Sequence, residues 1–78
     1  MGLITGFHYR PDSLPNYRTE IECGWNVVNS DGRTLLRLET YGSAGRQIQG
    51  KRSQSMELDE HAAAELMKIL SEAFPSLR

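Results

Sequence analysis

Thr19-Glu-Ile-Glu-Cys-Gly-Trp-Asn-Val-Val-Asn-Ser-Asp-Gly-Arg-Thr-Leu-Leu-Arg-Leu-Glu-Thr-Tyr41 is the stretch that sets the architecture of this chain. Its first part alternates apolar with polar or glycine residues, a period of two that is typical of a strand with one buried face. We therefore predict a strand from about residue 19 to 28. The Asp31-Gly32 pair is a strong β-hairpin signal, and a second strand is expected over about residues 33–41.

The hairpin register follows from the turn. With Asp31 and Gly32 at the two central turn positions, cross-strand partners have residue numbers that sum to 63. Val27 then lies opposite Leu36 and Trp25 opposite Leu38 on an inward apolar face, while Arg37 lies on the outward face. A slip of one residue would place Trp25 opposite Arg37, so the pattern favours this register.

The flanking segments complete an α+β fold. Alternation over residues 53–58 indicates a short third strand, and Asp59 stands where a helix N-cap is expected. The helix runs over about residues 60–74 and ends at Pro75, because proline cannot continue it. Residues 3–9 alternate weakly and provide a fourth strand. We expect a single domain over residues 1–78, with the order β-β-β-β-α and an antiparallel sheet of three or four strands. Residues 1–18 form a strand and loop that join the sheet or stay mobile.

Composition narrows the class of protein. The chain has 78 residues, a formal net charge of −1 and one cysteine. It contains no apolar run of the ~20 residues that a membrane-spanning helix needs, and no signal-peptide pattern. A single cysteine suits a reducing compartment, so a cytoplasmic protein without membrane contact is expected. The apolar arc of the helix is wide, and a homodimer through the C-terminal helix is one way to bury it.

Positive charge gathers in one part of the sequence. Residues 33–55 hold five basic residues and one acid, a balance of +4, whereas residues 56–78 hold two basic residues and five acids, a balance of −3. The glycine-rich segment 42–53 carries three basic residues and no acid. Guanidinium and ammonium groups suit phosphate oxygens, and an aromatic ring can stack on a base. The candidate nucleic-acid-binding residues are Arg33, Arg37, Tyr41, Arg46, Lys51 and Arg52.

Catalytic chemistry has little support. Cys23 falls on the inward strand face and is expected to be a buried thiol. His8 and His61 belong to no triad or metal-spacing motif, and His61 is expected to face solvent in the first helical turn. Glu20 and Glu22 share a strand face that is expected to be solvated, although an enzyme with a pocket near them and Tyr41 remains an alternative. We therefore expect no enzyme activity, metal or cofactor.

The part from Trp25 onward resembles the PC4-like transcriptional coactivator family of small single-stranded-DNA-binding proteins. The matching features are the strand with Trp25, the strand Leu36-Arg-Leu-Glu-Thr-Tyr41, Gly50-Lys51 before a short strand, Leu58-Asp-Glu60 at a helix start, and Ala64-Glu-Leu-Met-Lys-Ile-Leu70. The resemblance implies a β-β-β-β-α protomer that dimerises largely through its helix, with Arg37, Tyr41 and Lys51 at matching binding positions. The segment 42–50 is longer than the family's, and the chain lacks a basic N-terminal tail.

Two functions follow. The first is a small non-catalytic protein that binds single-stranded DNA or RNA through the basic sheet face and the segment 42–53. The alternative is a protein-interaction module, such as an accessory subunit or inhibitor of a larger nucleic-acid enzyme. In that alternative, Val28 and Leu35 on the outward sheet face would anchor the protein partner.

Overall fold

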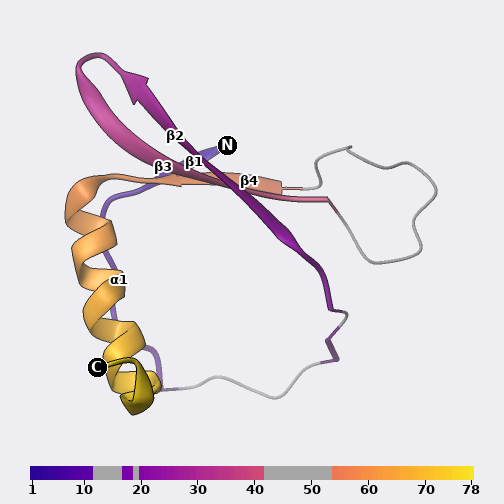
Figure 1. Ribbon diagram of the computed structural model, residues 1–78, viewed down its shortest axis with the longest axis vertical. Helices are drawn as coiled ribbons and strands as arrows, with labels where there is room; N and C mark the ends of the chain where they lie inside the picture. The colour runs from indigo at the N-terminus through magenta and orange to yellow at the C-terminus, as the bar shows by residue number, and fades with distance from the viewer. Residues whose placement is uncertain (12–16, 19, 42–53) are drawn as a thin grey trace.

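A four-stranded sheet followed by one helix forms the fold, in the computed structural model of the chain, which describes residues 1–11, 17–18, 20–41 and 54–78 (Figure 1). The elements are β1 (Gly2–Ile4), β2 (Cys23–Ser30), β3 (Arg33–Thr40), β4 (Gln54–Leu58), α1 (Glu60–Ala73) and a short 3₁₀ helix, η1 (Pro75–Leu77). The strand order across the sheet is β1-β4-β3-β2. The predicted α+β class and element order are confirmed.

The β2–β3 hairpin has the predicted register. Ser30 pairs with Arg33, Val27 with Leu36, and Trp25 with Leu38, so partner numbers sum to 63. Asp31 and Gly32 both have positive φ, 51° and 76°, as the two central positions of a type I′ turn require. The predicted start of the first hairpin strand is less accurate: β2 begins at Cys23 rather than Thr19.

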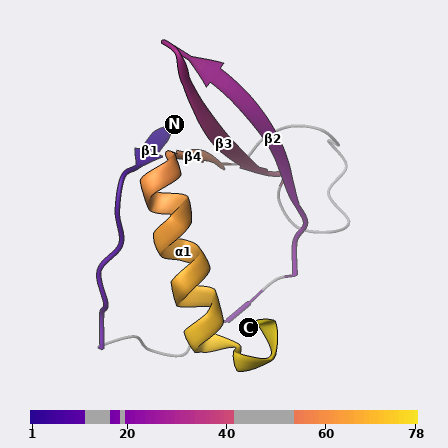
Figure 2. The ribbon, with the colours of Figure 1, turned by 60° about the vertical axis from the view of Figure 1, so that its left-hand side comes forward.

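The expectation of a wholly antiparallel sheet is wrong at β1. This strand pairs with β4 in parallel, with Gly2 opposite Met56 and Ile4 opposite Leu58. It covers residues 2–4, whereas the prediction was residues 3–9. The chain leaves the sheet after Ile4, and the Phe7 N–H donates to Glu65 Oε1 of α1 at 3.1 Å. The following residues run beside the helix (Figure 2).

The helix α1 begins and ends as predicted. The Asp59 carboxylate accepts a hydrogen bond from the Ala62 N–H at 2.8 Å, which satisfies one of the free donors of the first turn. At the other end the Phe74 N–H donates to the Leu70 carbonyl, and Pro75 opens η1. The helix starts directly after β4 and extends away from the strands (Figure 2).

The core of the described residues is small. Its buried hydrophobic side chains are Leu35, Leu58 and Ala62, with exposed fractions of 4%, 2% and 0%. Leu58 immediately precedes the helix and shares a sheet face with its partner Leu36, whereas Leu35, the neighbour of Leu36 in β3, lies on the opposite face. The sequence had instead predicted a core on the inward face of the hairpin, formed by Trp25, Val27, Leu36 and Leu38.

Several residues predicted to face a core are exposed, because α1 projects away from the sheet instead of lying flat across it. On the predicted inward sheet face, Trp25 is 72% and Val27 53% exposed, while Leu36 and Leu38 are half-buried. Along the helix, only Ala62 of the predicted apolar arc is buried, and Met67 and Phe74 are 70% and 56% exposed. The second half of the helix therefore has no buried side chain in the described chain.

Candidate nucleic-acid interface

The outward face of β3 carries three of the predicted site residues. Residues of one parity share a strand face, so Arg33 and Arg37 lie on the same side of the sheet, and Tyr41 directly follows the strand at the next position of that series. The row from Arg33 to Tyr41 spans eight residue-to-residue steps, about 26 Å of extended chain. Arg33, at the hairpin end of the row, is exposed.

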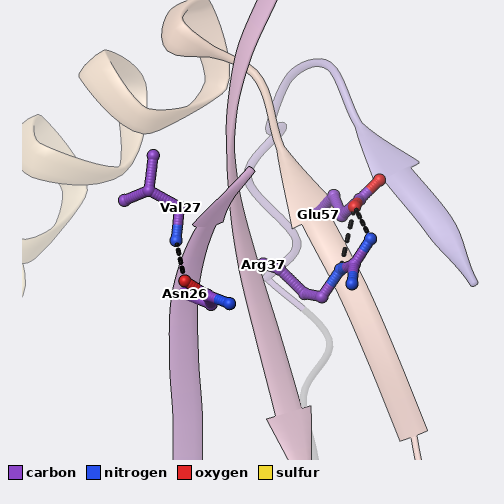
Figure 3. Close-up of polar contacts among 4 residues, drawn as sticks. All are labelled: Asn26, Val27, Arg37 and Glu57. Carbon is purple, nitrogen blue, oxygen red and sulfur yellow. Dashed lines mark hydrogen bonds and ion pairs between the residues drawn. The ribbon is translucent and has the colours of Figure 1, made fainter. Parts of the chain in front are cut away.

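Arg37, in the middle of the row, is engaged by a carboxylate. Its Nε and Nη2 atoms both donate to Glu57 Oε2, at 3.0 and 2.9 Å, as Figure 3 shows. The two residues are direct cross-strand partners on β3 and β4. Their side chains are 31% and 14% exposed. The charge of Arg37 is thus offset locally, and its guanidinium is held in place by the sheet.

Tyr41 packs on a glycine of the neighbouring strand. A Cβ atom at Gly24 would lie 2.6 Å from the Tyr41 hydroxyl oxygen and 3.1 Å from a ring carbon. Only glycine at this position leaves room for the ring in its present place. The half-buried Tyr41 therefore takes its orientation from β2, and Gly24 is a positioning residue that the sequence reasoning missed. The sequence signal for this role was a glycine within an otherwise regular strand. Such a glycine often marks a site where another group lies close to the strand backbone.

Asn26 completes the polar side of the hairpin. It is the register partner of Arg37, and its Oδ1 accepts a hydrogen bond from the Val27 N–H at 2.8 Å, also drawn in Figure 3. Because β2 is an edge strand, this bond occupies a backbone donor that an added strand would otherwise use. At Val27, the edge of β2 is therefore less able to pair with a further strand.

The three other predicted site residues, Arg46, Lys51 and Arg52, lie outside the described residues. The two ends of their segment are adjacent, because Thr40 of β3 pairs with Gln54 of β4. Residues 41–53 therefore connect neighbouring strands at the Tyr41 end of the row. Within β3 and β4, the polar face itself carries two arginines, Arg33 and Arg37, and two acids, Glu39 and Glu57. In the sequence, segment 42–53 holds three basic residues and no acid.

The structure also places the residues considered for catalysis. Cys23 is exposed rather than buried, and its thiol donates to the Gly24 carbonyl at 3.4 Å. His61 faces solvent as predicted, 73% exposed and 3.7 Å from Glu65. Glu20 and Glu22 are exposed and precede β2.

The described part of the chain holds neither a metal-binding cluster nor a membrane-spanning helix. Among residues 1–11, 17–18, 20–41 and 54–78, no group of three or more His, Cys, Asp or Glu side chains is arranged to hold a metal ion. Within the same ranges, no helix combines the length and apolar character needed to cross a bilayer.

Comparison with known proteins identifies no relative. No family model, no curated protein and no solved structure matches this chain.

Proposed function

We propose that this chain is a small, non-catalytic protein of the cytoplasm that binds single-stranded nucleic acid, DNA or RNA, on the polar face of its sheet. One observation carries the proposal: Arg33 and Tyr41 stand at the two ends of one row on β3, and the Tyr41 end continues into the segment with Arg46, Lys51 and Arg52. The resemblance to PC4-like proteins favours the same ligand.

The polar face offers the two kinds of contact that a flexible strand needs. Cationic side chains bind phosphates without regard to sequence, and an aromatic ring stacks on a base. In this proposal Arg33 and the basic residues of segment 42–53 bind phosphates, and Tyr41 stacks on a base. A single strand suits an open sheet because its bases are free to turn toward the protein.

The proposed role of Arg37 differs from that of the other basic residues. Since Glu57 accepts hydrogen bonds from both Nε and Nη2 of Arg37, it occupies two of the guanidinium donors and offsets the charge of Arg37 locally. We assign to Arg37 mainly the support of the β3–β4 pair, and to Arg33, Lys51 and Arg52 the phosphate contacts.

The test is a pair of charge-matched double variants. Lys51→Glu with Arg52→Glu, and Lys68→Glu with Arg78→Glu, each change the net charge from −1 to −5. Lys68 and Arg78 belong to the helical end of the chain. We expect the first variant to lose most affinity for single-stranded oligonucleotides and to flatten its dependence on salt, by about 0.7 in the log–log slope for each phosphate that the variant no longer binds. Equal affinity for both variants would refute the assigned surface.

A second candidate function, a module that binds another protein, has its own supporting observation, the exposed side chains Trp25, Val27, Met67 and Phe74. The anchor predicted for it is wrong in part: Leu35 is only 4% exposed and cannot reach a partner. An anchor would instead involve Trp25 and Val27, and replacing both by serine should abolish partner capture while leaving polyanion binding intact. Loss of polyanion binding in that variant would contradict a separate protein-binding surface.

A further inference from the structure

Asn26 carries a side-chain amide that is held in one orientation on the polar face of the sheet. Its Oδ1 accepts a hydrogen bond from the Val27 N–H at 2.8 Å. That donor fixes which end of the amide faces the backbone, because an amide nitrogen in the same place could not accept the bond. Figure 3 shows the amide with its oxygen at the Val27 N–H and its nitrogen turned the other way.

The amide nitrogen of Asn26 is available to a ligand. The residue is exposed, and among the described residues its Nδ2 donates to no acceptor. An amide nitrogen has two N–H donors and no acceptor capacity. Asn26 therefore presents hydrogen-bond donors, whereas its oxygen is turned to the backbone.

Asn26 lies beside the ring to which the proposed function assigns base stacking. Tyr41 packs on Gly24, and Asn26 is the next residue on that face of β2, about 6.6 Å further along the strand. The cross-strand partner of Asn26 is Arg37, whose Nε and Nη2 are engaged by Glu57. A nucleotide stacked on Tyr41 thus has the uncharged donors of Asn26 at the neighbouring position.

The fixed amide discriminates between bases by its donors alone. Asparagine reads adenine through two hydrogen bonds at once, in which Oδ1 accepts from N6 and Nδ2 donates to N7. In Asn26 the oxygen is bound to the backbone, so this pair of bonds is not formed. The donors suit bases with a keto oxygen, which are O4 of thymine or uracil and O6 of guanine. Cytosine and adenine carry an amino group at the corresponding position, and that group only donates.

We infer that Asn26 makes the polar face select thymine, uracil and guanine over cytosine and adenine. The inference rests on the proposed function, because it assigns a base preference to the same surface. Phosphate contacts and stacking supply no such preference, since every nucleotide has a phosphate and every base has a π-face. Glu39, the partner of Gly24, carries a carboxylate, which only accepts. A reader of that kind favours the amino bases, so the sign of the preference shows which group reads the base.

The test compares oligo(dU) with oligo(dC) of equal length. Their bases are pyrimidines of equal size, with a keto oxygen on uracil where cytosine has an amino group. We expect the wild-type chain to bind oligo(dU) about fivefold more tightly, the value of one uncharged hydrogen bond. Fluorescence anisotropy at one low salt concentration measures the two Kd values and their ratio.

Two variants with the same change in charge assign the preference to a residue. Asn26→Asp replaces the amide nitrogen by an oxygen and keeps an acceptor for the Val27 N–H. A carboxylate accepts from the cytosine amino group, so the ratio should reverse toward oligo(dC) while the added charge weakens both complexes. Asn29→Asp is the matched control. Asn29 lies on the opposite face of β2 and accepts from Thr34 Oγ1, so its replacement should leave the ratio unchanged.

The outcomes distinguish this inference from the proposed function. Equal wild-type affinity for the two oligomers, or a ratio that Asn26→Asp leaves unchanged, would overturn the inference while the proposed function stands. Absence of binding to both oligomers would refute the proposed function, and the inference with it. If Asn26→Asp does not fold, Asn26→Ser serves instead: it removes the Nδ2 donors and should bring the ratio to one, and an unchanged ratio would again overturn the inference.

Discussion

Replacing Arg37 by methionine should destabilise the protein without weakening nucleic-acid binding. The change removes the guanidinium and keeps an apolar stem of similar length. It leaves the Glu57 carboxylate, only 14% exposed, without the two hydrogen bonds that it accepts from Arg37. A half-buried charge that loses its partner destabilises the fold, so the effect should exceed that of an ordinary surface substitution.

The magnitude follows from the geometry of the pair. Two unit charges 2.9 Å apart attract by about 6 kcal/mol at an effective dielectric constant of about 20. Desolvation and side-chain ordering offset most of that attraction: exposed pairs contribute about 0–1 kcal/mol, and breaking a fully buried pair costs about 3–5 kcal/mol. Arg37 is 31% exposed, so we expect a loss of about 1.5 kcal/mol. For a domain of this size, that loss lowers Tm by about 6–12 °C.

The assay is urea unfolding at one fixed protein concentration, on Arg37→Met, Glu57→Gln and the double variant. The coupling energy from this cycle should be about 1 kcal/mol. Arg33→Met is the matched control: Arg33 is exposed on the same strand face, and its replacement should change stability by less than about 0.5 kcal/mol while weakening oligonucleotide binding. A coupling energy near zero, or Arg37→Met losing as much affinity as Arg33→Met, would refute the structural role of Arg37.

Two further substitutions test local features of the fold and the site. Gly24→Ala places a methyl group where the Tyr41 ring lies, so it should displace the ring and reduce single-strand affinity by about tenfold, the value of one base stack. Unchanged affinity, measured by anisotropy, would contradict the orienting role assigned to Gly24. Asp59→Ala removes the carboxylate that accepts the Ala62 N–H and should lower stability by about 1 kcal/mol. Thermal unfolding measures this loss, and an unchanged Tm would contradict the N-cap assignment.

Local signals in the sequence were sufficient for the hairpin and the helix. The Asp31-Gly32 turn and the parity of the flanking residues determine which residues pair, because a slip by one would reverse both faces. Asp59 and Pro75 bound the helix through backbone hydrogen bonding, which depends on neighbours in the chain. Such features need no knowledge of the tertiary arrangement.

Apart from the limits of β1 and β2, the errors concern contacts between distant segments. The parallel pairing of β1 with β4 joins residues more than fifty positions apart, and no turn signal encodes it. The exposure of Trp25 depends on the direction in which α1 leaves the sheet, which alternation within β2 does not report. For the same reason the sequence placed Arg37 correctly on the outward face but did not reveal that Glu57 would bind it.

The central claim, that the polar face of the sheet binds single-stranded nucleic acid, is tested most directly by fluorescence anisotropy. Labelled single-stranded DNA, single-stranded RNA and duplex DNA of equal length would each be titrated with the wild-type chain at two salt concentrations. We predict binding that weakens with salt and prefers the single strands over the duplex, because Tyr41 can stack only on an unpaired base. Absence of binding to all three at low salt would contradict the claim.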